Sequence, residues 1–348
     1  MLQFLVKRWF LLSLTTLIVA GMALGGAVPA VVRPIADALN PLLMTASILF
    51  LMSFSLETRQ LQAALRTPLP VMLGSVLNIG VAPMLGAALM PLQGVVDFRY
   101  GLLAASCVPC TMAAASVWTR KAHGNDAISL LVTLVTNTAS IITIPFWLSL
   151  ALAWFPISGA SESPSALVAD VALLDLKQTA IELVVGVLLP IMLGQIARQS
   201  PRLSDWALRH KVGISAVAQM LILVMVWTAA VKGGVRISQT KLVIGAGDIL
   251  LVWGSVIVVH LTTLYAGLFL CRSLGVPRAD QIAVAFAGSQ KTLPVGLLIS
   301  ETLSRQAGLG LAVFPMLMYH ASQLFLDTII ADRFVAREQL RVDEKTRL

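Results

Sequence analysis

Apolar residues in this chain are gathered into long blocks that contain no charged side chain. Most of these runs reach the roughly 20 residues that an α-helix needs to cross the hydrocarbon core of a bilayer. The run at 183–197 is shorter, but Glu182 and Lys177 can reach the outer interface from its end. A further segment, 281–300, has the right length and carries Lys291 in its middle. The pattern therefore predicts ten membrane-spanning helices. The charge-free runs are 9–32, 38–56, 67–96, 100–119, 127–161, 183–197, 212–231, 249–271 and 306–326.

The first run also resembles a cleaved leader. Lys7 and Arg8 precede it, and it ends near Ala27-Val28-Pro29-Ala30, which has the small residues of a signal-peptide cleavage site. We favour a retained first helix, because the rest of the chain needs a membrane in any case and an even number of spans then follows.

The distribution of basic residues predicts the orientation. With the N-terminus in the cytoplasm, 17 of the 25 Lys and Arg residues fall in inside segments and 7 in outside segments. Cytoplasmic loops carry the excess of Lys and Arg in membrane proteins. We therefore expect a multi-pass protein of the plasma (inner) membrane with both termini in the cytoplasm. The loop at 232–241 is a local exception, and the Ser- and acid-rich loop at 158–175 suits the outside.

Composition agrees with the pattern. Of 348 residues, 57% are hydrophobic and 12% are charged, whereas a soluble domain has about 25% charged residues. This excludes an ordinary soluble enzyme and a disordered scaffold. The net charge of +8 indicates topology rather than a nucleic-acid partner. The sequence contains no HExxH, Walker A or dinucleotide-binding glycine motif, which argues against an enzyme.

Ten spans divide into two sets of five, and an odd number per half makes any repeat an inverted one. Gly74-Ser75-Val76 recurs as Gly254-Ser255-Val256, which is a weak trace. A better trace is that spans 4 and 9 are both interrupted, at 109–112 and at 288–294, where Pro109 and Pro294 lie. Paired interruptions at matching positions point to a binding site at the membrane midplane of a secondary transporter. A proline kink with only a packing role is the alternative.

Lys291 is the one charge that the loops, span ends and tail do not accommodate. A charge at mid-bilayer costs about 2.5–3.5 kcal/mol on insertion scales, and such residues usually face a cavity. The functional interpretation is a fixed positive charge that attracts an anionic substrate or replaces a bound cation. The alternative is a lysine near an interface that snorkels to water.

Other polar residues lie within the spans. Ser129, Thr133, Thr136 and Asn137 follow one face of span 5, and Ser or Thr alone often just bonds its own helix. Further polar residues are Asn78 in span 3, His260, Thr262 and Thr263 in span 8, and His320 and Gln323 in span 10. Cys107 and Cys110 have CxxC spacing, but the only other cysteine is Cys271, so a redox or metal role is disfavoured.

These segments together resemble the bile acid:sodium symporter superfamily, and most closely its SBF-like branch. The resemblance is carried by 109–116 (PCTMAAAS), 288–293 (GSQKTL) and 315–320 (PMLMYH), with Gly124-Asn125 and Gln323. It implies a core domain of spans 3–5 and 8–10 beside a panel domain of spans 1, 2, 6 and 7. It also implies broken spans 4 and 9 that cross, and sodium-coupled uptake of organic anions. The family's sodium ligands would map onto Asn78, Ser129, Thr133 and Gln290.

The chain departs from that pattern where sodium would bind. Sodium-binding members have Ser-Asn where this chain has Ala114 and Ala115, and Glu where it has Phe286. They have Asn where it has Lys291. Sodium needs oxygen ligands, so a site that loses a carboxylate and gains an ammonium should bind it poorly. We therefore expect the Lys291 ammonium to replace one sodium and to weaken sodium coupling.

The sequence as a whole predicts an all-α membrane protein with repeats at 1–160 and 161–332 and a cytoplasmic tail at 333–348. We expect a secondary active transporter for an organic anion, bile-acid-like or a small carboxylate, with no cofactor other than sodium. A proton-coupled carrier, an uncoupled carrier and a non-transporting regulatory protein remain alternatives. An intramembrane enzyme would need a nucleophile–base pair such as Cys110 near His320. The predicted substrate-binding residues are Thr111, Ser116, Gln290, Lys291, Thr292, His320 and Gln323; the predicted cation ligands are Asn78, Ser129, Thr133 and Gln290.

Overall fold

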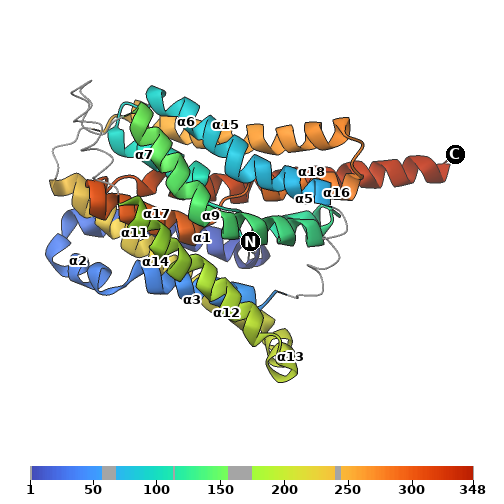
Figure 1. Ribbon diagram of the computed structural model, residues 1–348, viewed down its shortest axis with the longest axis horizontal. Helices are drawn as coiled ribbons and strands as arrows, with labels where there is room; N and C mark the ends of the chain where they lie inside the picture. Colours follow the sequence, from blue (N-terminus) through green and yellow to red (C-terminus); the bar gives the residue numbers. More distant parts are fainter. Residues whose placement is uncertain (1, 57–67, 113, 156–174, 240–243, 348) are drawn as a thin grey trace.

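A computed structural model of the chain describes residues 2–56, 68–112, 114–155, 175–239 and 244–347. The described part is built from helices (Figure 1). Their bounds are α1 Leu2–Ala27, α2 Pro29–Ala38, α3 Pro41–Phe54, α5 Pro68–Val76, η1 Leu77–Val81, α6 Ala82–Leu89, η2 Met90–Leu92, α7 Val96–Cys107, α8 Ala114–Lys121, α9 Asp126–Trp154, α11 Leu176–Leu183, η3 Val184–Leu188, α12 Leu189–Ala197, α13 Pro201–Arg209, α14 Lys211–Gln239, α15 Ala246–Ser273, α16 Arg278–Ser289, α17 Leu293–Ala307 and α18 Val313–Arg347.

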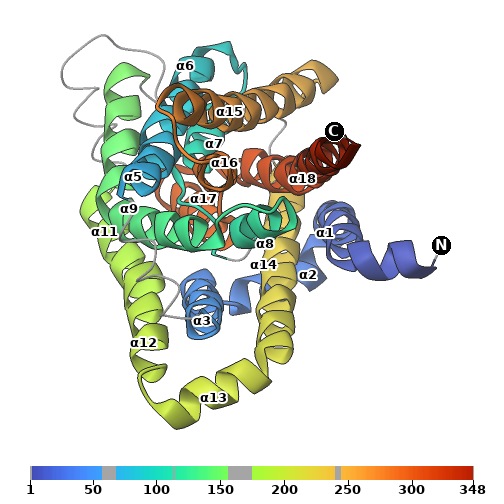
Figure 2. The same cartoon turned by 90° about the vertical axis from the view of Figure 1, so that its right-hand side faces the viewer.

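The helices form two layers. In Figure 1, α5, α6, α7, α9, α15, α16 and α18 lie above α1, α2, α3, α12, α13 and α14. Figure 2 shows α3 between α12 and α14, and α13 joining those two helices at the edge of the molecule. Helix α17 contacts both layers, because it packs against α7 and α18 on one side and against α3 and α14 on the other.

Glycine residues allow α1 and α14 to pack closely in the lower layer. A Cβ atom on Gly25 would lie 2.2 Å from the carbonyl oxygen of Val231, and one on Gly234 would lie 2.2 Å from that of Met22. Small residues allow membrane helices to pack backbone to backbone in this way. Gly21, one turn before Gly25, faces the same helix, since its Cβ would lie 2.9 Å from that of Ala230.

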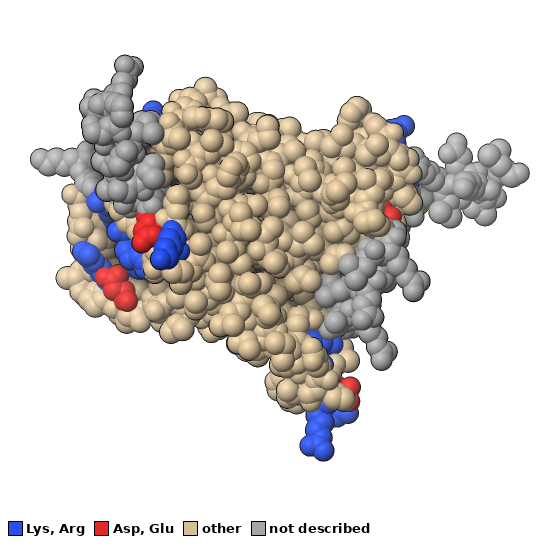
Figure 3. All heavy atoms as spheres, in the orientation of Figure 1, with Lys and Arg blue, Asp and Glu red and all other residues tan. Residues whose placement is uncertain are grey.

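Six helices in the described part are long and apolar enough to cross a membrane, and a seventh appears if α2 and α3, which meet at a 52° bend, count as one span. Figure 3 shows a wide band without charged atoms between two charged ends of the visible face. The first predicted run does not form a single helix, because α1 ends at Ala27 and α2 begins at Pro29. Residues 333–347, predicted as a tail, continue α18.

The predicted boundary between repeats, at 160–161, lies outside the described residues. So do Arg59 and Arg66, which were counted among the inside basic residues, and Lys241, which was counted among the outside ones. One expectation about charge is wrong. Asp327 is fully buried, and Glu182 and Asp97 are 6% and 7% exposed, so Lys291 is not the single charge within the packed part of the chain. Glu182 does not snorkel but accepts a hydrogen bond from Thr302 and pairs with Arg305.

Candidate functional site

The two predicted interruptions are real helix breaks, and they touch. Helix α7 ends at Cys107 and α8 begins at Ala114, while α16 ends at Ser289 and α17 begins at Leu293. The amide of Thr292 in the second break donates a hydrogen bond of 2.9 Å to the carbonyl of Pro109 in the first. The breaks therefore join backbone to backbone, and we call residues 108–112 and 290–292 together the crossing.

The ammonium of Lys291 lies inside the crossing. The residue is 0% exposed, so the snorkelling alternative is wrong. Its Nζ donates to the carbonyl of Asn78 at 2.6 Å, to that of Val108 at 3.0 Å and to Oδ1 of Asn78 at 3.4 Å. An ammonium has three donors and no acceptor. Three oxygens thus surround it as oxygen ligands surround a small hard cation.

Local backbone irregularities free the two carbonyls. Asn78 lies in the π-helix η1, where the amide of Ala82 donates a hydrogen bond to the carbonyl of Leu77, five residues earlier. By the same spacing the carbonyl of Asn78 faces the nitrogen of Pro83, which has no N–H to donate. Val108 is extended and caps α7 at its C-terminus, which is the end where the helix dipole favours a cation. The side chain of Asn78 then binds the other break, because its Nδ2 lies 2.9 Å from the carbonyl of Gln290.

The polar stripe on α9, whose spacing predicted a shared helix face, lies against the first break. Asn137 donates to the carbonyl of Cys110 at 2.9 Å. The hydroxyl of Thr133 lies 2.9 Å from the carbonyl of Ser129 in its own helix and 3.3 Å from that of Thr111. The hydroxyl of Thr136 accepts from the amide of Cys110 at 3.2 Å. The hydroxyl of Ser129 is buried and has no hydrogen-bond partner among the described residues. The stripe thus satisfies backbone groups that the break leaves without helical partners.

Gln323 on α18 holds the second break at Lys291. Its Oε1 accepts from the amide of Lys291 at 2.8 Å, and its Nε2 donates to the carbonyl of the same residue at 2.9 Å. The Nε2 also lies 2.9 Å from Nδ1 of His320. Because an amide nitrogen only donates, Nδ1 of His320 is the acceptor and carries no proton.

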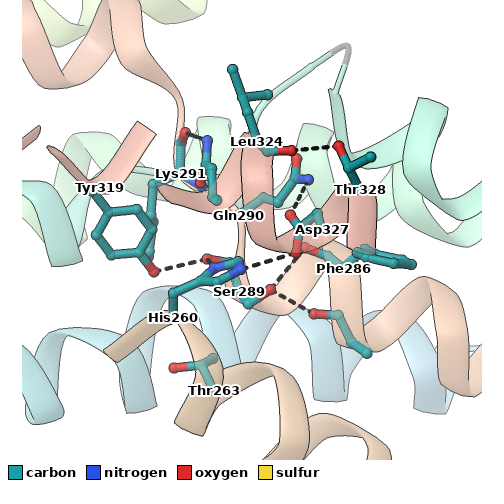
Figure 4. Close-up of polar contacts among 12 residues, drawn as sticks. His260, Thr263, Phe286, Ser289, Gln290, Lys291, Tyr319, Leu324, Asp327 and Thr328 are labelled. Atoms are coloured by element: carbon teal, nitrogen blue, oxygen red, sulfur yellow. Dashed lines mark hydrogen bonds and ion pairs between the residues drawn. The ribbon is translucent and has the colours of Figure 1, made fainter. Parts of the chain in front are cut away.

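A second buried network lies beside the crossing and centres on Asp327, which the sequence reasoning missed (Figure 4). Oδ1 of Asp327 is 2.9 Å from Nε2 of His260, and Oδ2 accepts from Nε2 of Gln290 at 2.6 Å. His260 and Asp327 are both 0% exposed. Asp327 follows the last charge-free run directly, so it looked like a residue at a span end. Its spacing of four residues from Gln323 and seven from His320 was the available signal, since such residues share a helix face.

The remaining predicted residues also lie near the crossing. Thr292 caps α17 and is 1% exposed, while Thr111 and Ser116 are 6% and 5% exposed in and just after the first break. A pocket of about 280 Å³ lies elsewhere, between α2, α14 and α17. Its charged lining residues are Arg33, Asp37, Lys232, Arg236, Glu301 and Arg305.

Comparison with known proteins decides the family. The sequence profile of the SBF-like CPA transporter family matches residues 8–336. The chain belongs to the SBF-like CPA transporter family. This family is described as one of transporters.

Relatives in this group come from distant organisms. The Escherichia coli (strain K12) protein named "Putative symporter YfeH" is 27% identical over 71% of this chain and 68% of its own length. "Sodium/bile acid cotransporter 7" of Xenopus tropicalis is 22% identical over 95% of this chain and 92% of its own length. "Sodium/bile acid cotransporter 7" of Mus musculus is 23% identical over 82% of this chain and 80% of its own length.

Proposed function

We propose that the protein is a secondary active transporter that moves an organic anion across a membrane by alternating access. One observation carries the proposal: two broken helices meet in the middle of the chain's packed core, and the ammonium of Lys291 is held there by carbonyl oxygens. A helix break is tolerated at membrane depth where it is enclosed by protein or lines a cavity. In transporters such breaks bind the coupling ion and the substrate.

The proposal includes ten spans. The six long apolar helices supply six of them, and α1, α3, the α7–α8 pair and α18 would supply the others. Spans 4 and 9 would then be the two broken ones, at equivalent places in two inverted halves of five. The upper layer would correspond to the core domain, and α1–α3 with α11–α14 to the panel domain. The excess of basic residues in alternate loops supports cytoplasmic termini.

In this proposal the Lys291 ammonium takes the place of one sodium ion, which weakens sodium coupling. The three oxygens around Nζ support it, since the ammonium uses ligands that a cation would use. Ser129 and Gln290 each have a buried side-chain oxygen without a partner among the described residues. These two residues and Thr133 are our proposed ligands for a residual cation.

The substrate would be a bile-acid-like anion or a small carboxylate. The names of the relatives, sodium/bile acid cotransporter among them, support an organic anion. The positive charge of Lys291 would attract it by its field, because the ammonium itself is already bound. The polar residues of the crossing would line its path, namely Thr111, Ser116, Gln290, Thr292, His320 and Gln323.

Uptake by proteoliposomes tests the function. Radiolabelled taurocholate and a set of small carboxylates would be offered to purified protein, with and without a sodium gradient. We expect concentrative uptake of at least one anion with little dependence on sodium, and loss of that uptake in Lys291→Ala. Full sodium dependence would refute the replacement of sodium by Lys291. Failure to concentrate any anion would favour a regulatory role for the fold.

A further inference from the structure

A second pocket, which the proposed function does not use, lies at the end of the molecule that carries the C-terminus. Its volume is about 370 Å³, and α15, α16 and α18 supply its lining. Figure 1 shows the end of α15, the start of α16 and the outgoing part of α18 together at this end. No Asp or Glu among the described residues lines the pocket, whereas four arginines do, namely Arg272, Arg278, Arg333 and Arg337. We call it the arginine pocket.

Two parallel helices form walls of the arginine pocket with the same spacing of residues. Helices α15 and α18 run in the same direction, because Trp253 donates to Ser322 and, further along both helices, His260 lies against Asp327. Residues at i, i+3, i+4 and i+7 share one helix face, and each helix contributes such a set. On α15 the set is Tyr265, Leu268, Phe269 and Arg272. On α18 it is Ile330, Arg333, Phe334 and Arg337.

The wall on α15 changes from apolar to charged along the helix axis. Tyr265 and Phe269 are 51% and 70% exposed. Arg272 lies in the last turn of the helix, about 10 Å beyond Tyr265 at 1.5 Å per residue. The headgroup layer on each side of a bilayer is about 5–8 Å thick. Because α15 is long and apolar enough to cross a membrane, its aromatic side chains would reach the edge of the hydrocarbon core and its arginine the headgroup layer.

The wall on α18 is held in place by packing. The ring of Phe334 is 8% exposed and meets the ring of Phe286 edge-on, with 6.0 Å between the centroids. The guanidinium carbon of Arg278 lies 5.0 Å from the centre of the Phe334 ring. A cation over an aromatic face is attracted to it. One donor group of the pocket is therefore oriented before any ligand arrives, which lowers the cost of binding.

The carboxylates that are nearest along the chain are bound elsewhere. The side chain of Asp280 accepts from Asn125 at 2.9 Å, and Asp332 pairs with Lys121 at 2.6 Å. Within the part of the chain that the structure describes, no carboxylate pairs with Arg272, Arg333 or Arg337. Like charges that share one cavity repel one another, so this arrangement needs an anion.

The pocket between α2, α14 and α17 differs in this respect. There the carboxylates of Asp37 and Glu301 lie 3.7 and 2.8 Å from the ammonium of Lys232, so the protein supplies the opposite charge itself. The orientation of a membrane protein requires an excess of basic residues on one side, but not that they converge on one cavity. Neither pairing within the chain nor orientation therefore accounts for the arginine pocket.

We propose that the arginine pocket binds the headgroup of an anionic phospholipid. Guanidinium groups match the oxygens of a phosphate with paired N–H donors, and basic pockets between membrane helices bind such headgroups. The acyl chains would lie along the exposed faces of Tyr265 and Phe269. In the orientation proposed above, the lipid belongs to the cytoplasmic leaflet. The inference does not involve the crossing, so it is independent of the transport function.

Native mass spectrometry of the purified full chain counts bound lipids directly. The protein in a neutral detergent would be titrated with dioleoylphosphatidylglycerol and, separately, with dioleoylphosphatidylcholine, which has the same chains and no net charge. We expect one phosphatidylglycerol to stay bound per chain at concentrations where phosphatidylcholine does not. Arg333→Gln with Arg337→Gln should weaken that binding by roughly tenfold or more, because each arginine adds attraction to an anionic lipid. Equal binding of the two lipids by wild type would overturn the proposal.

The matched control changes the net charge by the same amount at another place. Arg202→Gln with Arg209→Gln removes two exposed arginines of α13 and should leave the binding of phosphatidylglycerol unchanged. Thermal unfolding in phosphatidylcholine checks that both double variants are folded, and we expect the wild-type Tm because all four side chains are exposed. Equal losses of binding in the two double variants would indicate a general attraction to basic surface and would refute the site.

The acyl chains distinguish a lipid from a soluble phosphate. Glycerophosphate carries the same phosphate without the chains and should not displace phosphatidylglycerol at equal concentration. Phe269→Ala should weaken the binding of phosphatidylglycerol, whereas Leu250→Ala, which removes a side chain that is 67% exposed near the start of α15, should not. Displacement by glycerophosphate, or an unchanged affinity in Phe269→Ala, would identify a soluble organic phosphate as the ligand and refute the lipid.

Discussion

Replacing Lys291 by alanine should create a sodium site in this protein. The substitution removes the donor to two buried carbonyls, those of Asn78 and Val108. Each buried acceptor left without a partner costs about 1–3 kcal/mol, so the variant should lose about 2–6 kcal/mol of stability in a sodium-free buffer. The space left by the side chain is then lined by these carbonyls and by Oδ1 of Asn78. In the wild type the Lys291 ammonium occupies these three oxygens. In Lys291→Ala they would be free to bind sodium.

Sodium should therefore restore part of that loss. An ion that binds only the folded state at 100 times its Kd adds about 2.7 kcal/mol, and each kcal/mol raises Tm by roughly 2–4 °C in a chain of 150–250 residues. Thermal unfolding of Lys291→Ala would be compared in NaCl and in choline chloride at equal ionic strength. We expect a higher Tm in NaCl for Lys291→Ala. Wild type and Lys232→Ala, which removes a lysine outside the crossing, should not respond. Equal Tm values for Lys291→Ala in the two salts would refute the view that the ammonium replaces sodium.

Three further predictions concern the helix contacts outside the crossing. Gly234→Ala should lower the stability by about 1–3 kcal/mol, because its Cβ would lie 2.2 Å from the carbonyl oxygen of Met22. Gly213→Ala, whose Cβ meets open space, should not lower it. Thermal unfolding of both variants checks this prediction. Glu182→Ala should lower the stability by about 3 kcal/mol, since it removes the carboxylate that Thr302 and Arg305 bind. Arg305→Ala should lower it less, because the Arg305 side chain is 56% exposed. Equal losses of stability in the two variants would contradict this reasoning. The ion pair of Lys232 and Glu301, whose side chains are 25% and 29% exposed, should contribute no more than about 1 kcal/mol. Thermal unfolding of Glu301→Gln, which leaves the 3.7 Å contact of Lys232 with Asp37 in place, checks this.

Several features of the fold and the site could be predicted from the sequence, because they depend on local chemistry. Pro109 and Pro294 predicted the two helix breaks, and the spacing of Thr133 and Asn137 predicted that they share one face of α9, although not that this face meets a break. The charge of Lys291 identified the centre of the crossing. Inside a membrane a proline, a polar side chain or a charge can be accommodated in only a few ways, so each of these residues predicts its own surroundings.

Other features depend on contacts between distant segments, and no local pattern encodes them. The pairing of His260 with Asp327 joins residues 67 positions apart, and it appears only when α15 and α18 are packed together. The sequence did not reveal the π-helix at Asn78. Its effect depends on which carbonyl lies opposite Pro83, and that is known only once the helix register is known. The Lys291 ammonium was expected either to attract an anionic substrate or to replace a bound cation, and only the structure shows that it donates to the backbone carbonyls of Asn78 and Val108.

The way the crossing is held has a consequence for the transport cycle. Its hydrogen bonds run to α9, α18 and η1, all in the upper layer, whereas towards the lower layer Thr45 on α3 reaches the carbonyl of Pro294 at a long 3.3 Å. Under alternating access, movement of the crossing relative to η1 would strip the ammonium of its ligands. Sliding of the whole upper layer past α3 would leave them intact. If the proposed alternating access occurs, the distance between Lys291 and Asn78 should therefore stay constant through the cycle, while the distance between α3 and α17 should change.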